Sequence, residues 1–200
     1  TLLTSGVTFA DMGAYEFLGD SNDDTPPQLT STYPAMVESA TISHPLKWIV
    51  ITFSEPISPI DARAAANYRL VAAGSDGTWG TGDDFVYTLR PQAEQGSNLA
   101  TIEILEGYLP PGLYRFAVSG TTTIHDLAGM PLDGDRTGTG GVNYVRTFTV
   151  AEALLDFGDA PDPTYPTLLA RNGARHIVVA GLHLGSQIDP ESDGNPNPDA

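Results

Sequence analysis

Apolar residues alternate with polar ones in short runs through the middle of the chain. In residues 46–54, Ile49, Ile51 and Phe53 occupy every second position. Successive side chains of a β-strand point to opposite faces, so this period predicts a strand with one buried face. The same period predicts further strands at residues 67–72, 85–90, 99–105, 113–119 and 144–150.

Clusters of Gly, Pro, Asn and Asp separate these runs, as is typical of antiparallel strands joined by tight connections. In residues 58–67, Asp61 precedes a run of alanines that favours one or two helical turns. No long segment carries a helical period. Strands that recur at this spacing without intervening helices predict an all-β fold, an antiparallel β-sandwich, and not a parallel α/β sheet.

Both flanks depart from this pattern. Residues 1–20 hold one short apolar stretch, and residues 21–27 (SNDDTPP) have the paired prolines and polar side chains of a linker. After residue 150 the composition shifts toward Pro, Asp and Gly, with one expected strand at residues 176–184. We therefore expect a sandwich at residues 28–150, followed by an incomplete acidic module at residues 151–200.

Acidic residues outnumber basic ones by 25 to 9, which gives a formal net charge of −16. Such a surface repels nucleic acid and anionic lipid, because both are bound through Lys and Arg, and its natural partners are cations. We expect no direct membrane insertion, since no apolar run is long enough to span a bilayer. Divalent ions would offset the self-repulsion of the chain, which favours an extracellular location. The absence of cysteine fits that location and the cytosol equally well.

The central segment contains ITFSEPIS (residues 51–58), LPPGLYRFAVSG (109–120) and HDLAGMPLDGD (125–135). These phrases resemble bacterial Ig-like domains of the kind found in S-layer and other large surface proteins, and the resemblance extends over residues 26–150. It implies an Ig-like sandwich that acts as a spacer or interaction module at the cell surface or outside the cell.

Two flanking stretches resemble other families. ADMGAYEF (residues 10–17) resembles the closing coil of secreted parallel β-helix domains, which implies that residues 1–20 are the tail of a preceding domain. DFGDAPDPTYPTLLARNGARH (residues 156–176) resembles the opening of a module found in giant secreted proteins of Planctomycetes and similar bacteria. The resemblances together imply that the chain is part of a longer protein.

Two loops have the composition of calcium sites. Calcium takes six to eight oxygen ligands, which loops rich in Asp and Gly can supply on a tightly curved backbone. The first loop, DGTWGTGDD, offers Asp76, Asp83 and Asp84, and it lacks the residue order of an EF-hand. The second offers Asp133 and Asp135.

Asp126 is a further candidate ligand beside the second loop, and the two loops could share one ion. The alternative for both loops is that Asp and Asn side chains accept hydrogen bonds from their own backbone in Asx turns. The acidic residues of the C-terminal segment could likewise form one shared site or only an exposed acidic linker. These residues are Asp156, Asp159, Asp189, Glu191 and Asp193.

We expect no catalytic activity. A chain with 25 acidic residues has many accidental carboxylate pairs, so their number is no evidence for a glycosidase. Glu55 follows a strand in ITFSEP, and the Ig-like resemblance makes it a recurrent strand-end residue rather than a catalytic acid. The histidines lack the spacing of a zinc site, and the serines lack a nucleophile elbow.

Aromatic side chains leave a second function open. Sugars stack on aromatic faces, so a glycan platform is one role for these residues, and core or loop-anchoring packing is the other. The candidates are Trp48, Trp79, Tyr108 and Tyr165. A glycan platform would make the chain an accessory carbohydrate-binding module of a polysaccharide-degrading enzyme.

The favoured hypothesis is a non-catalytic, calcium-stabilised structural or adhesive module of a large secreted or cell-surface bacterial protein. Its partners would be other protein domains or copies of itself, joined through the edge strands of the sandwich, with head-to-tail assembly as a secondary hypothesis.

Overall fold

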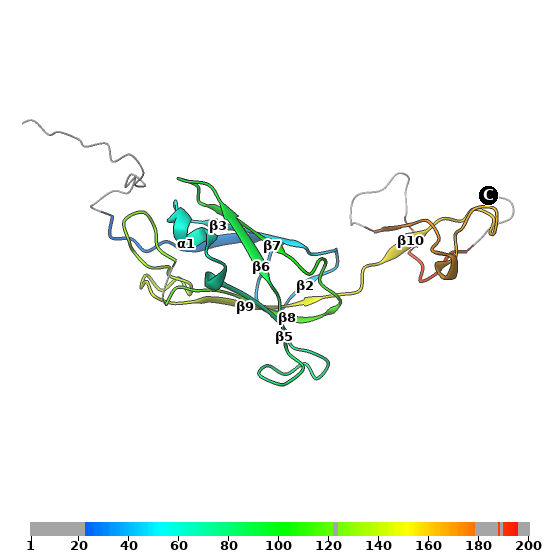
Figure 1. Cartoon of the computed structure of the whole chain (residues 1–200), viewed down its shortest axis with the longest axis horizontal. Coiled ribbons are helices and arrows are strands. Elements are labelled where there is room, and N and C mark those ends of the chain that lie inside the picture. The colour runs from blue at the N-terminus through cyan, green and yellow to red at the C-terminus, as the bar shows by residue number, and fades with distance from the viewer. Residues whose placement is uncertain (1–22, 122–123, 179–187, 189, 196–200) are drawn as a thin grey trace, which may run out of the picture.

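Two β-sheets packed face to face form the body of the structure (Figure 1). The computed structural model describes residues 23–121, 124–178, 188 and 190–195. The segment at residues 1–20, which resembles the end of a β-helix domain, lies outside the described residues.

The first sheet has four strands in the order β1-β3-β7-β6, and every neighbouring pair is antiparallel. The strands are β1 (Leu29–Tyr33), β3 (Trp48–Phe53), β6 (Leu89–Ala93) and β7 (Leu99–Ile104).

The second sheet has five strands in the order β2-β9-β8-β4-β5. They are β2 (Ala40–Ile42), β4 (Tyr68–Ala72), β5 (Phe85–Val86), β8 (Gly112–Val118) and β9 (Tyr144–Val150). Neighbouring strands are antiparallel apart from β2 and β9, which run parallel. The predicted all-β, Ig-like sandwich is confirmed, with this one parallel pair added.

The core is built by the alternation visible in the sequence. Ile49, Ile51 and Phe53 of β3 are at most 1% exposed. From the second sheet, Tyr114 stacks on Phe148 with ring centroids 5.5 Å apart. Burial of apolar side chains from both sheets is the main force that holds the two layers together.

The strand expected at residues 85–90 is in fact two strands in different sheets. β5 pairs with β4, whereas β6 pairs with β7. Between them the chain crosses from one sheet to the other at Tyr87 and Thr88. Phe85, Tyr87 and Leu89 continue the period-two pattern through the crossing, so the pattern alone does not reveal the change of sheet.

The sequence does not predict strands β1 and β2, because β1 is largely polar and β2 has only three residues. Each is an edge strand, where only one side of the backbone pairs with a neighbour.

The predicted helical turns after β3 are confirmed as α1 (Pro59–Arg63) and the 3₁₀ turn η1 (Ala65–Asn67). Ser58 is the N-cap of α1 and accepts a hydrogen bond from the backbone N–H of Asp61, and Pro59 begins the helix. This turn borders the loop that carries Asp126, because the Asp61 carboxylate accepts from the backbone N–H of His125.

The C-terminal segment forms a small separate hairpin of β10 (Leu155–Phe157) and β11 (Arg175–Ile177), with the 3₁₀ turn η2 (Leu169–Arg171) between them. The strand expected at residues 176–184 begins one residue earlier and ends at Ile177. Residues 179–187 lie outside the described residues.

Phe148→Ala should destabilise the chain by about 3–5 kcal/mol, because it removes a fully buried ring and leaves a cavity between the sheets. Thr149→Ala is the matched control on the exposed face of β9 and should change the free energy of unfolding by less than about 0.5 kcal/mol. Urea unfolding measures both, and equal effects would contradict the core described here.

Candidate metal site

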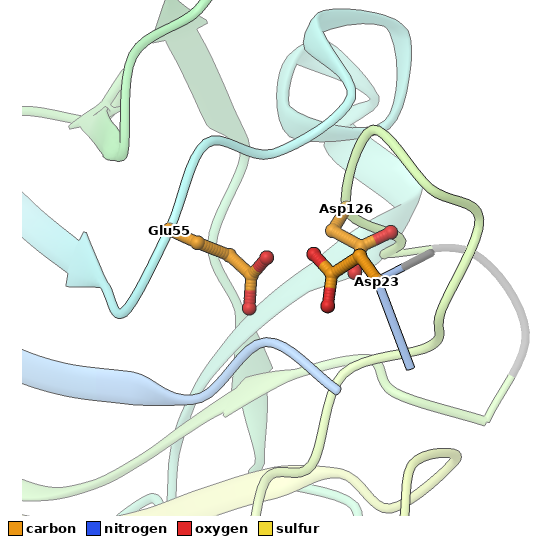
Figure 2. A group of neighbouring side chains, drawn as sticks. All are labelled: Asp23, Glu55 and Asp126. Atoms are coloured by element: carbon orange, nitrogen blue, oxygen red, sulfur yellow. The ribbon is translucent and has the colours of Figure 1, made fainter. Parts of the chain in front are cut away.

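Three carboxylates meet at one end of the sandwich. Asp23, Glu55 and Asp126 each place an oxygen within 4.8 Å of the others (Figure 2). They come from three segments that are distant in the sequence: the connector before β1, the turn after β3, and the loop that follows β8.

Asp126 is held by a tight local turn. Its backbone N–H donates to Met130 O over 3.0 Å, and its Oδ1 accepts from the backbone N–H of Met130 over 2.8 Å. Gly129 lies within this turn at φ +90°, a conformation that glycine adopts without strain. The turn leaves Asp126 only 3% exposed.

The second oxygen of Asp126 has no hydrogen-bond partner although it is fully buried. A buried carboxylate oxygen without a donor or a cation loses its hydration and gains nothing in return. This oxygen belongs to the carboxylate that faces Asp23 and Glu55 (Figure 2). A cation bound by all three groups would satisfy it.

Glu55 is fixed by the backbone on either side of it. Ser54 exchanges two hydrogen bonds with Gln28, one of 2.8 Å through its N–H and one of 2.9 Å through its hydroxyl. Ile57 pairs with Asp126 in an isolated antiparallel bridge. Burial first, and then the neighbouring Asp23 and Asp126 carboxyls, together raise the pKa of Glu55 from 4.5 to about 7.

Asp23 completes the group from the connector. Its Oδ1 accepts from the backbone N–H of Thr25 over 3.0 Å, and the side chain is half-buried. The three groups together carry up to three negative charges in a small volume. This set of oxygen donors suits a hard divalent cation such as calcium, with water completing the coordination.

Of the eleven predicted ligands, Asp126 alone belongs to this group. In the described part of the chain, no other set of three acidic or histidine side chains comes within 4.8 Å. The sequence places Asp23 in a linker and Glu55 at the end of a strand. The local sequence gives no signal that these two positions meet Asp126, because only the pairing of the strands brings them together.

The first predicted loop is organised by hydrogen bonds to its own carboxylates. Asp83 Oδ2 accepts from the N–H and hydroxyl of Ser75 over 2.7 and 2.9 Å, and the Thr81 hydroxyl donates to Oδ1 over 2.7 Å. These hydrogen bonds, from Thr81 first and then from Ser75, lower the pKa of Asp83 to about 2. A Cβ at Gly74 would lie 2.4 Å from the same carboxyl, which is why glycine stands there.

Asp76 and Asp84 accept from Thr78 N and Gly80 N, each over 2.7 Å. Hydrogen bonds of this kind, from the loop backbone to its own Asp side chains, are what the alternative without a metal predicts. Calcium binding by this loop stays a prediction. Figure 1 shows the loop between β4 and β5 projecting away from the segment that follows β8.

In the second predicted loop, Asp133 is fully buried and acts as a hydrogen-bond acceptor. Its Oδ2 accepts from Gln28 Nε2 and from Gly138 N, both over 2.8 Å, and its Oδ1 accepts from Thr137 N over 3.1 Å. Burial opposes its ionisation, but these donors outweigh burial and lower its pKa. Asp135 is exposed and accepts from Thr137. Calcium at these two residues also stays a prediction.

The acidic residues of the C-terminal segment lie around the β10–β11 hairpin. Asp156 pairs with His176 over 3.0 Å, and Glu191 accepts from Phe157 N over 3.1 Å. Asp193 accepts from Leu169 N over 2.6 Å. Asp159 lies in the turn after β10, and Asp189 is outside the described residues, so the predicted shared site remains untested.

The aromatic candidates do not lie on one surface. Trp48 projects from β3 in the first sheet, whereas Trp79 packs under the Arg115 guanidinium of the second sheet, 4.7 Å from the ring centroid. Trp79 is half-buried, which agrees with loop-anchoring packing. Tyr108 and Tyr165 are 67% and 61% exposed on separate segments.

Comparison with known proteins identifies a sequence family. Residues 23–150 match the model of a family described as bacterial Ig-like domain. No curated protein sequence matches the chain.

Solved structures resemble the chain at low sequence identity. PcoC, a methionine-rich copper resistance protein from Escherichia coli, is 18% identical with a TM-score of 0.43, over 62% of this chain and 98% of that one. The N-terminal part of the bacterial S-layer protein SbsC is 16% identical with a TM-score of 0.40, over 80% of this chain and 33% of that one. CopC from Methylosinus trichosporium OB3b is 15% identical with a TM-score of 0.37, over 63% and 94%. Likeness at this level carries no information on function.

With divalent metal removed by a chelator, the chain should lose stability as the pH rises from about 5 to about 8. Glu55 titrates at about 7 in the folded state and near 4.5 when unfolded. Between these values the folded state holds a proton that the unfolded state has released, so stability falls as the pH passes the folded pKa. Thermal unfolding of Glu55→Gln should show a shallower slope, whereas Glu94→Gln, an exposed control, should keep the parent slope. A parent-like slope in Glu55→Gln would sink this prediction.

Asp133→Ala should destabilise the chain by about 3 kcal/mol, because it leaves the Gln28 amide and two backbone N–H groups without their acceptor. Asp135→Ala, two residues away and exposed, should cost less than about 1 kcal/mol. Urea unfolding with and without calcium measures both effects. A loss of calcium response in Asp135→Ala alone would show that this loop binds the ion.

Proposed function

The chain belongs to the bacterial Ig-like domain family, and we propose that it is a non-catalytic, calcium-stabilised structural module of a large secreted or cell-surface protein. The observation that carries the proposal is the buried, unpartnered Oδ2 of Asp126, which belongs to a carboxylate facing Asp23 and Glu55. A cation at that point would neutralise the mutual repulsion of three segments that the fold has already brought together.

Calcium suits this position better than other common ions. All three groups are carboxylates, whereas zinc prefers nitrogen and sulfur ligands. Extracellular modules bind calcium with dissociation constants of about 0.1–1 mM. At a roughly 100-fold excess of free ion, one site adds about 2.7 kcal/mol, a large share of the about 5–15 kcal/mol that keeps a domain folded. The ion would thus serve in place of a disulfide, which a chain without cysteine lacks.

The sheet edges support the structural part of the proposal. Each sheet ends in strands that have a neighbouring strand on one side only, β1 and β6 in the first and β2 and β5 in the second. Phe85 and Val86 of β5 are 49% and 50% exposed, so this edge offers apolar surface as well as free backbone groups. Such an edge can accept a strand from another domain or from a second copy.

Within the described residues, the helices are all too short or too polar to cross a bilayer.

Thermal unfolding with calcium and with a chelator tests the metal. The midpoint should rise with calcium by roughly 5–10 °C, which corresponds to about 2.7 kcal/mol. Asp126→Asn should abolish most of this rise, because it removes the only fully buried ligand of the group.

Asp24→Asn is the matched control, since it changes the same charge on an exposed neighbour of Asp23. It should keep the calcium response. An unchanged midpoint of the parent chain in calcium would disprove the metal site and leave the sandwich itself untouched.

A further inference from the structure

We infer that the ion at Asp23, Glu55 and Asp126 fastens the connector of residues 23–27 to the sandwich, so that calcium controls how firmly the segment before the domain is held. This inference rests on the proposed calcium site and adds a role for it. The connector is the part of the site that precedes the first strand of the domain.

Among the described residues, the backbone hydrogen bond that ties the connector to the domain lies at its end nearest to β1. Pro27 O accepts from Asp133 N over 2.9 Å, and the Gln28 amide donates to Asp133 over 2.8 Å. Pro26 and Pro27 have no N–H to donate. At the other end, the carboxyl of Asp23 reaches Glu55, and its Oδ1 is used locally by Thr25 N. The position of Asp23 therefore depends on whether a proton or a cation lies between these carboxylates.

The three ligands differ in freedom of movement. Asp126 is locked by its turn with Met130, and Glu55 follows a strand-end residue that is bonded to Gln28. When all three groups are ionised and no cation is present, their repulsion acts on the most mobile member, which is Asp23. A divalent ion reverses the sign of this interaction and draws the connector onto the domain.

Binding and fastening are coupled in both directions. If the ion orders the connector, then a connector that is already ordered binds the ion more tightly. The entropy cost of ordering Asp23 no longer opposes binding in that case.

The absence of cysteine makes a direct test straightforward, since an introduced cysteine is the only labelling site. A nitroxide is attached at Thr25→Cys in the full 200-residue chain, and a control label is placed at Thr149→Cys on the exposed face of β9. Continuous-wave electron paramagnetic resonance records label mobility with about 1 mM calcium and with chelator. Calcium should slow the label at position 25 severalfold and leave the label at position 149 unchanged.

The slowing should disappear in Asp126→Asn and in Asp23→Asn backgrounds. Asp23→Asn guards against misfolding, because this residue lies outside the sheets and its replacement leaves the core intact. Asp24→Asn should keep the full response.

Calorimetric titration with calcium separates this inference from the proposed function. Calcium binding that depends on Asp126, together with an unchanged label at position 25, would overturn the fastening role and leave the metal site standing. No binding heat and no midpoint shift would overturn both. A slowed label that persists in Asp126→Asn would place the ion elsewhere and overturn the inference.

Discussion

Burial of alternating apolar side chains between two sheets is the interaction on which the rest of the structure depends. It fixes the register of every strand, because a slip of one residue would turn Ile49, Ile51 and Phe53 out to solvent. Once the strands are fixed, their ends are fixed too. Glu55 and Asp126 then lie near each other because β3 and the segment after β8 end at the same place, and Ile57 bridges to Asp126.

The scarcity of basic residues shapes the polar part of the molecule. Lys47 and Arg90 both pair with the buried carboxylate of Glu103, the first at 3.3 Å. Arg136 donates to backbone carbonyls of β1. In the described ranges, the ion pairs end on Glu103, Asp61, Asp162 and Asp156, and none reaches the three carboxylates. These carboxylates therefore depend on a proton or on a cation from solution.

The sequence predicts the fold class and most of the central strands, since these properties follow from local alternation and turn composition. It also predicts the helical turn after β3. It does not predict the edge strands β1 and β2, which are too short or too polar to show a clear period, or the crossing between β5 and β6. Of the three clustered carboxylates, the sequence singles out Asp126 but not Asp23 or Glu55, because loop composition reports on neighbours along the chain. Their meeting is a product of the sheet topology. In the first predicted loop, DGTWGTGDD, the composition suggests a calcium ligand. There, however, backbone N–H groups of the loop already donate to Asp83.

The described chain enters the sandwich beside β1 at one end and leaves it after β9 at the opposite end (Figure 1). A pull on the two ends would therefore act along these strands. The backbone hydrogen bonds of antiparallel strands lie perpendicular to that direction, so the bonds between β1 and β3 and between β8 and β9 would be sheared together and would not open one at a time. The three carboxylates at the entrance to β1 stand where such a pull would first be applied.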